Sequence, residues 1–212
     1  MNSKIFGKRF KAGVLLVLLP SFVFLGTPLE ANPRGGRVVH GDATIQRVNA
    51  NQLRIHQRSQ SAIINWDDFS IAKGDLTRFR QPNRNASVLN RVTTGNVSQI
   101  HGQLKANGNV FVVNPNGIVI GQNGVVDVAG NAVFSTLDID DDDFLDGGNN
   151  RFYGNSTTGV TNRGTISSTD GDVILLGGFV DNQGQIGALN GTVALGSGGE
   201  ILVREEAGSK IS

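Results

Sequence analysis

The second half of the chain consists of short apolar segments in which Val, Ile or Leu alternate with small or polar residues. A period of two is typical of a β-strand with one buried face, and the Gly residues between the segments indicate tight turns. No segment has a helical period long enough to cross over a flat sheet. The pattern therefore predicts an all-β chain of short strands.

Two of these segments repeat each other at an offset of 20 residues. VTNRGTISSTDGDVILLG begins at Val160, and VDNQGQIGALNGTVALG begins at Val180. A weaker, slightly shorter copy runs through Gly102, Leu104, Gly108 and Val110. The matching pairs are Val160 and Val180, Asn162 and Asn182, Gly164 and Gly184, Ile166 and Ile186, Gly171 and Gly191, Val173 and Val193, and Leu175 and Leu195. We therefore predict a parallel β-helix with about 20 residues per coil and strands about 4.8 Å apart.

Asn occupies an equivalent place in both copies, at Asn162 and Asn182. Stacked coils would bring the two side-chain amides together, so we expect a ladder that caps corner backbone groups. The Val, Ile and Leu residues of each copy are expected to point into the shaft.

The segment NVFVVNPNGIVIG, residues 109–121, places a rigid turn between two strongly β-forming runs. Pro115 suits the second position of a tight turn, and Asn116 and Gly117 tolerate unusual backbone angles. The turn fits a corner of a coil, with Val110, Val112, Ile118 and Ile120 as inward residues. A hairpin that branches off the shaft is the alternative, and turn chemistry alone leaves both open.

Residues 1–31 have the layout of a secretory signal peptide. Lys4, Lys8, Arg9 and Lys11 precede an almost wholly apolar stretch, residues 12–25, which is short for a membrane span, so a cleaved signal is expected and a retained anchor is the alternative. Cleavage after Ala31 would leave 15 Lys and Arg against 17 Asp and Glu, a formal charge of −2. The basic balance of the precursor therefore gives no argument for nucleic acid binding, and no basic patch interleaved with aromatics is evident.

The chain has no Cys, so its stability must come from a core of adequate size. About 180 residues after the signal peptide suffice for one such domain.

Candidate chemistry is sparse. The acidic run Asp138, Asp140, Asp141, Asp142, Asp143 lacks EF-hand spacing and is expected to be a solvated loop without metal. His40, His56 and His101 lack the close spacing of a catalytic metal site. No nucleophile elbow, Walker loop or Cys nucleophile is present. Trp66 is expected to pack over the end of the shaft in a cap, with carbohydrate stacking as the alternative.

From Pro33 onward the chain resembles the N-terminal secretion domain of two-partner secretion exoproteins, the filamentous-haemagglutinin group. The likeness covers residues 32 to about 148, and the later repeats resemble the coils that follow. It is carried by NPRGGRVVHGDATI, AIINWDDFSIAKGDLTRFRQPN, VLNRVTTGNVSQIHGQLKANGNVFVVNPNGIVIG and FSTLDIDDDDFLDGG. The NPNGI segment preceded by SQIHGQLKANG is the most specific part.

The resemblance implies a right-handed parallel β-helix with an N-terminal β cap, exported by the Sec pathway. It further implies recognition in the periplasm by the POTRA domains of a cognate outer-membrane transporter. The secretion motif of the family falls on Asn114, Pro115, Asn116, Gly117 and Ile118, and no cofactor is implied. An Asn-Pro-Asn-Leu segment found in some members has no match here.

We therefore expect residues 32–212 to be a non-enzymatic secretion domain of a secreted or surface-exposed, adhesin-like exoprotein with an unspecified host or cell-surface target. An autonomous adhesin without a transporter is one rival. A polysaccharide-active β-helix enzyme is the other, although the polar positions of the aligned coils are mostly Asn, Thr, Ser and Gln rather than convergent carboxylates. The final segment, GGEILVREEAGSKIS, reads as a further coil that breaks off at Ser212.

Overall fold

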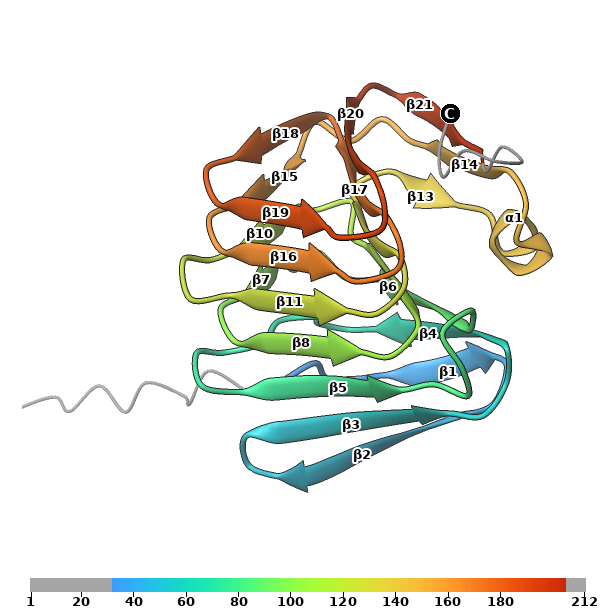
Figure 1. The fold of residues 1–212 in the computed structure, drawn as a ribbon, viewed down its shortest axis with the longest axis vertical. Coiled ribbons are helices and arrows are strands. Elements are labelled where there is room, and N and C mark those ends of the chain that lie inside the picture. Colours follow the sequence, from blue (N-terminus) through green and yellow to red (C-terminus); the bar gives the residue numbers. More distant parts are fainter. Residues whose placement is uncertain (1–31, 205–212) are drawn as a thin grey trace, which may run out of the picture.

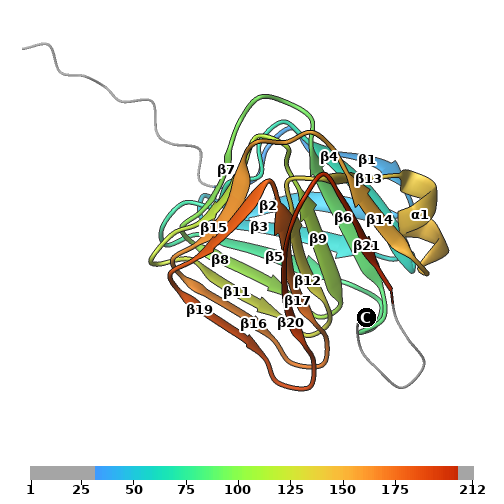
Figure 2. The ribbon, with the colours of Figure 1, turned by 90° about the horizontal axis from the view of Figure 1, so that it is seen from above.

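The computed structural model describes residues 32–204, and the expected signal peptide, residues 1–31, lies outside them. The described chain winds into a stack of coils with three strand faces, best seen along the stack in Figure 2. We name each face after one strand. The β9 sheet contains β1 (Arg37–His40), β4 (Ser61–Trp66), β6 (Ser87–Val92), β9 (Asn109–Val113), β12 (Ala132–Ser135), β17 (Val173–Gly177) and β20 (Val193–Ser197). The β10 sheet contains β7 (Ser98–Ile100), β10 (Ile118–Ile120), β15 (Gly159–Asn162) and β18 (Phe179–Asn182).

The third face, the β11 sheet, lies at the front of Figure 1. It contains β2 (Ala43–Asn49), β3 (Gln52–Gln57), β5 (Leu76–Arg80), β8 (Gln103–Ala106), β11 (Val125–Val128), β16 (Thr165–Ser168) and β19 (Gln185–Ala188). A short separate sheet of β13 (Asp138–Ile139), β14 (Asn150–Tyr153) and β21 (Glu200–Val203) stands beside the stack with the helix α1 (Asp141–Asp146).

The register of the strands confirms the repeat found in the sequence. Val160 pairs with Val180, Ile166 with Ile186, and Val173 with Val193, all in parallel. The 20-residue spacing also holds between Ser98 and Ile118, but it does not hold throughout the stack. Val110 pairs with Ala132, 22 positions later, and Ser61 with Ser87, 26 positions later. The molecule is thus a parallel β-solenoid of about 7 turns with about 22 residues per coil.

Antiparallel strands close the N-terminal end, as expected for a cap. β1 pairs antiparallel with β4, and β2 pairs antiparallel with β3. Trp66 lies beneath this cap, 1% exposed, and its indole Nε1 donates to Asn90 Oδ1 at 3.0 Å. A Cβ at Gly36 would collide with both Trp66 and Ile45 of β2, so the cap packs directly on the indole. The carbohydrate-stacking alternative for Trp66 is therefore wrong.

The core has two parts because both faces of the β9 sheet are covered. Val110, Val112, Ile118 and Ile120 point into the shaft and are fully buried, as the alternation predicts. The outward residues of β9, Phe111 and Val113, are buried too, beneath the segment that carries α1. This second cluster comprises Ile63, Leu89, Phe111, Val113, Val133, Leu137, Ile139, Phe144, Phe152, Ile174 and Leu176. Double burial explains the unbroken apolar run of β9, which a strand with one solvated face would not need.

This covering segment, residues 136–158, leaves the coil between β12 and β15, and we call it the excursion. It lengthens one coil, so that Ala132 pairs with Val173, 41 positions later. Thr136 Oγ1 donates to the Thr158 carbonyl at 3.2 Å, which joins the first and last residues of the excursion. The expectation that the acidic run forms a solvated loop is wrong in part, because the run continues into the helix α1. Phe144 of this helix packs edge-on against Phe111, with 5.2 Å between the ring centroids.

The last described strand also departs from expectation. A further parallel coil would place residues 199–202 beside β18, whereas β21 instead pairs antiparallel with β14 of the excursion, Phe152 opposite Ile201. The side chain of Ile201 packs against the outer apolar cluster of the β9 sheet, which stabilises this antiparallel pairing. Within residues 32–204, no helix is long and apolar enough to span a membrane.

Candidate functional site

The segment Asn114–Gly117 forms a corner of the solenoid. It joins β9 to β10, which belong to different sheets and do not pair with each other, so the hairpin alternative is wrong. The Gly117 N–H donates to the Asn114 carbonyl at 3.1 Å and closes the turn. Gly117 has φ 115°, a left-handed angle that explains Gly here, since no atom crowds the position of a Cβ closer than 3.7 Å. Ile118 begins β10 inside the shaft.

The Asn114 side chain organises the corner from inside. It is fully buried, and its Nδ2 donates to the Asn96 carbonyl and to Ser98 Oγ, both at 2.9 Å. Its Oδ1 accepts from the Asn116 N–H at 3.0 Å and from Asn116 Nδ2 at 3.2 Å. Both amide hydrogens and both oxygen lone pairs are therefore used within the protein. Asn114 shapes the corner and offers no free donor to a partner.

Pro115 and Asn116 connect this corner with those of the neighbouring coils. Asn116 Nδ2 donates to the Thr94 carbonyl at 2.6 Å in the preceding coil. The Pro115 carbonyl accepts from Ser156 Oγ at 3.0 Å and from Thr158 Oγ1 at 2.8 Å, both in the end of the excursion. Three irregular segments, residues 93–97, 114–117 and 155–158, are thus joined by side-chain hydrogen bonds at one edge of the stack. We call them the corner surface.

The solvent-facing part of the corner surface combines apolar and amide groups. Pro115 is exposed, Asn116 is half-buried, and Val97 is 39% exposed and lies next to Gly117. Asn96 and Thr157 are exposed beside them. An apolar pair rimmed by amides and hydroxyls is the arrangement that a protein partner can cover.

Arg91 anchors the excursion to the stack, next to the corner surface in sequence. Its Nε donates to Asp138 Oδ1 at 2.9 Å, its Nη1 to Asp141 Oδ1 at 2.7 Å, and its Nη2 to the Ile139 carbonyl at 2.6 Å. Burial disfavours the charged guanidinium, but hydrogen bonds to Asp141 and Asp138 and their negative charges outweigh it, and the pKa of Arg91 is raised. Two carboxylates of the acidic run are therefore tied to this Arg, and Asp140 accepts from the Tyr153 hydroxyl at 2.6 Å.

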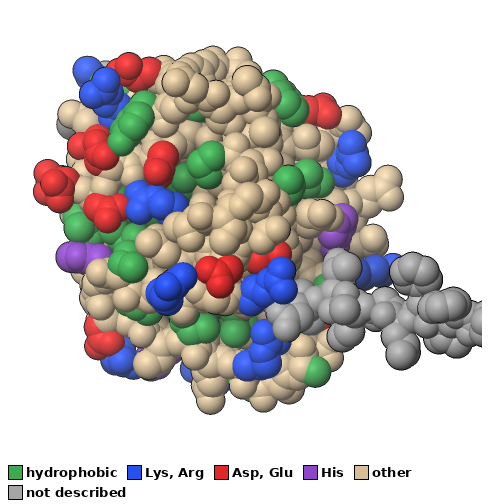
Figure 3. Space-filling view, turned by 180° about the vertical axis from the view of Figure 1, so that it is seen from behind, with side chains coloured by type: hydrophobic (Ala, Val, Ile, Leu, Met, Phe, Trp, Pro, Cys, Tyr) green, Lys and Arg blue, Asp and Glu red, His purple; other side chains and the backbone are tan. Residues whose placement is uncertain are grey.

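The other candidate residues do not converge. Among residues 32–204, no group of three or more His, Cys, Asp or Glu side chains is arranged to hold a metal ion. Figure 3 shows Asp and Glu interspersed with Lys and Arg over the back of the molecule. His40 belongs to β1 and His56 to β3, whereas His101 follows β7 and contacts Gln99.

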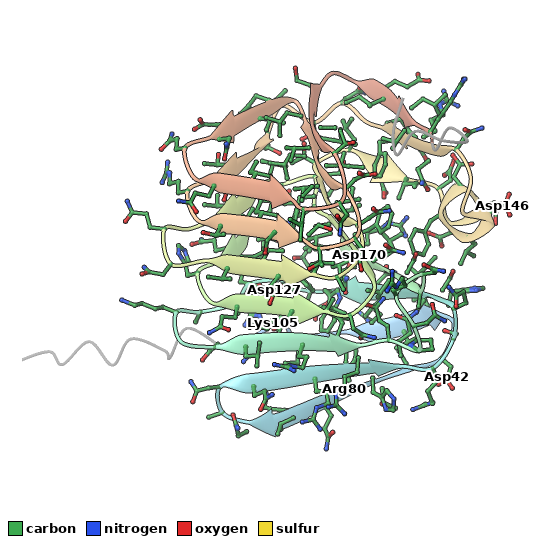
Figure 4. The ribbon with its side chains drawn as sticks, viewed as in Figure 1. Asp42, Arg80, Lys105, Asp127, Asp146 and Asp170 are labelled. Atoms are coloured by element: carbon green, nitrogen blue, oxygen red, sulfur yellow. The ribbon has the colours of Figure 1, made fainter. Side chains whose placement is uncertain are left out.

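A hollow of about 700 Å³ separates the excursion from the corners that follow the β11 sheet. Its lining includes Asp146, Asp170 and Asp172, the first two labelled in Figure 4. Asp170 pairs with Arg84 at 3.4 Å, and Asp172 accepts from the Thr192 N–H at 2.7 Å. These two carboxylates therefore make contacts within the fold.

The sequence did not reveal Arg91, nor the Ser98, Ser156 and Thr158 hydroxyls that hold the corner. Their partners lie 16 to 50 residues away, and no local pattern marks such contacts. The ladder between Asn162 and Asn182 was visible because it follows the repeat. Asn162 Nδ2 donates to Asn182 Oδ1 at 2.8 Å, and Asn162 Oδ1 accepts from the Gly164 N–H.

Comparison with known proteins gives a consistent result. A family model described as the TPS secretion domain matches residues 30–210. A heme/hemopexin-binding protein of Haemophilus influenzae is 38% identical over 175 residues, which are 78% of this chain and 19% of that protein. A second H. influenzae protein of the same name is 43% identical over 98 residues, 46% of this chain and 11% of that protein. The chain thus spans about a fifth or less of the length of these relatives.

Two solved structures share the fold. The HMW1 secretion domain from H. influenzae superposes with a TM-score of 0.75 at 36% identity, covering 85% of this chain and 47% of that one. The filamentous hemagglutinin secretion domain superposes with a TM-score of 0.53 at 13% identity, covering 82% and 67%. The solenoid, its cap and the match of the family model to most of the chain lead to one conclusion: the chain belongs to the TPS secretion domain family of two-partner secretion exoproteins.

Proposed function

We propose that this domain directs export of its exoprotein through recognition of the corner surface by the periplasmic POTRA domains of a cognate outer-membrane transporter. The exoprotein would reach the cell surface or the medium by way of the periplasm of a Gram-negative envelope. The Asn114–Ile118 motif acts in this proposal by holding residues 93–97, 114–117 and 155–158 in one arrangement. The domain acts by binding rather than by catalysis.

The observation that carries the proposal is that the motif combines a buried structural residue with an exposed one. All side-chain hydrogen bonds of Asn114 are made inside the protein, while Pro115 and Val97, which lies next to Gly117, face solvent. Turn chemistry accounts for Pro115, whereas it does not call for an exposed Val at position 97. Binding residues on loops held by a rigid scaffold are a common way to build a recognition surface.

We further propose that the capped end starts folding of the exoprotein as it emerges from the transporter. The antiparallel strands β1 and β2 close one end of the shaft, so each later coil can add its strands to a formed template. In solenoids, stability is approximately a sum of repeat and neighbour terms, and folding propagates from a formed unit.

The test compares two double variants of the chain. Val97→Asn with Pro115→Ala removes the apolar pair, and Val125→Asn with Pro82→Ala is the matched control, because Val125 is 36% exposed on the β11 sheet and Pro82 is exposed. Export by the cognate transporter and affinity for its purified POTRA domains are measured beside the thermal unfolding midpoint. We expect similar midpoints, with at least a tenfold loss of affinity for the corner variant alone. Export and binding equal to those of the control would overturn the proposal.

A further inference from the structure

The outward side of the β11 sheet carries a cluster of cations near the capped end. Arg54 pairs in register with Arg78, Arg78 with Lys105, and His56 with Arg80. Leu53, Ile55, Phe79 and Leu104 are buried, so alternation turns these polar side chains outward. Neighbouring strands lie about 4.8 Å apart, which places three cations in a row along the axis of the stack. We call Arg54, His56, Arg78, Arg80 and Lys105 the basic face.

The cations of the basic face have few carboxylate partners within the protein. Lys105 meets Asp127 at 3.5 Å, whereas Arg54, Arg78 and Arg80 form no ion pair within residues 32–204. Figure 4 shows Arg80 and Lys105 on the front sheet, with Asp127 next to Lys105. Asp42, near His56, is already paired with Arg58 at 2.6 Å, and the hydrogen bond from Arg58 lowers the pKa of Asp42. Like charges that face each other across strands destabilise a sheet, so the fold gains nothing from this arrangement.

Several arginines elsewhere on the domain have carboxylate partners, although Arg47 and Arg163 form no ion pair within residues 32–204. Arg37 lies 3.4 Å from Asp67, and Arg151 lies 2.8 Å from Glu200. The basic face differs from these sites because its cations face one another in register on neighbouring strands. It also lies on the β11 sheet, while the corner surface joins the other two sheets.

A hollow of about 520 Å³ lies among the cations of the basic face. It is lined by His56, Arg78, Arg80, Lys105 and Asp127 together with Asn107 and Thr169, whose side chains add hydrogen-bonding groups. The guanidinium groups suit sulfate and carboxylate, which they bind in a bidentate manner.

We propose that the basic face binds a linear anionic polysaccharide that carries sulfate or carboxylate groups along its chain. The equal spacing of the row favours a ligand with repeated charges over a single small anion. Among the described residues, Val48 and Val125 are the large exposed apolar residues of the β11 sheet, and neither is aromatic, whereas protein interfaces rely on apolar and aromatic anchors. The face also lacks an exposed aromatic ring on which bases of a single-stranded nucleic acid could stack.

The test uses the purified chain and immobilised dextran sulfate, with alginate as the carboxylated polymer and uncharged dextran as the blank. The variant is Arg54→Gln with Arg78→Gln and Arg80→Gln, and the control of equal charge change is Arg37→Gln with Arg151→Gln and Arg163→Gln. We expect the first variant to lose at least tenfold in affinity and the control to lose less than threefold. The slope of log affinity against log salt should fall by about 2 in the first variant, because fewer counterions are released.

A further variant keeps the experiment decisive if the Gln substitutions disturb the fold. Arg54→Lys with Arg78→Lys and Arg80→Lys retains the charge but not the bidentate geometry, so it should bind dextran sulfate more tightly than the Gln variant and less tightly than the native chain. Preference for dextran sulfate over alginate, or the reverse, identifies the anionic group that is recognised. Equal loss in the two Gln variants, equal binding to uncharged dextran, or tighter binding to poly-glutamate of matched charge would each overturn the proposal, the last in favour of an acidic protein partner.

Discussion

Replacement of Asn114 by Asp tests whether this side chain holds the corner from within. The substitution keeps the size of the residue and the oxygen that accepts from Asn116, but it removes both Nδ2 donors. The Ser98 hydroxyl can rotate to donate to the new carboxylate. The Asn96 carbonyl, 2.9 Å from Nδ2 in the native protein, would instead face a second acceptor. An unsatisfied buried acceptor costs about 1–3 kcal/mol, and burial of a carboxylate adds to it. We expect a total of about 3 kcal/mol at pH 7.

The cost should depend on pH with a known sign. Burial without a cationic partner raises the pKa of a carboxyl above the unfolded value of about 3.9, and the facing Asn96 carbonyl favours the protonated acid, while the Asn116 donors act in the opposite direction and limit the rise. Below pH about 3.9 both states are protonated, and the acid can donate to the Asn96 carbonyl, so the penalty shrinks. It grows as the pH rises toward the folded-state pKa and stays constant above it. Asn114→Ala should cost a similar amount without this pH dependence.

Urea unfolding followed by the fluorescence of Trp66, the only Trp and a buried one, measures both variants at pH 4 and pH 7. A loss of 3 kcal/mol corresponds to a fall of about 6–12 °C in the melting temperature of a domain of this size. Asn149→Asp, at an exposed position, serves as the control. A loss below about 0.5 kcal/mol for Asn114→Asp at pH 7, or an equal loss at both pH values, would refute the reasoning.

Three further predictions address the excursion and the coils. Arg91→Met should destabilise the domain by about 1–3 kcal/mol, and the loss stays in this range because the carboxylate partners are partly exposed. Limited proteolysis of this variant should cleave residues 136–158 before the rest of the chain. Gly191→Ala should lower the melting temperature because the new Cβ would collide with the carbonyl oxygen of Gly171, whereas Gly187→Ala, which meets no atom within 4 Å, should leave it within about 2 °C. Melting temperatures in excess EDTA and in millimolar calcium should agree, and a calcium-dependent rise of more than a few degrees would show that residues 138–143 bind the ion.

The periodic parts of the fold could be predicted from sequence because they repeat. Val160 and Val180 pair as their alignment requires, and the Asn162 ladder forms where the repeat places it. Burial of alternate residues in β9 and β10 followed from strand geometry alone. The resemblance added the N-terminal cap, which the register of β1 with β4 confirms.

The excursion could not be predicted because long-range contacts decide it. A helix as short as α1 is not stable by its own propensity, and here it depends on Phe144 packing on Phe111 and on Arg91 holding Asp141. The corner could not be told from a hairpin because the local turn requirements are the same. The direction of β21 depends on β14, which lies about 50 residues earlier in the chain.

The central claim, recognition of the corner surface, is tested most directly by amide hydrogen exchange of the chain with and without the purified POTRA domains of its transporter. Binding at the corner surface should slow exchange in residues 93–97, 114–118 and 155–158. Strands β5 and β8 of the basic face should exchange as in the free domain. Protection confined to the β11 sheet, with the corner amides unchanged in a complex of measurable affinity, would contradict the account.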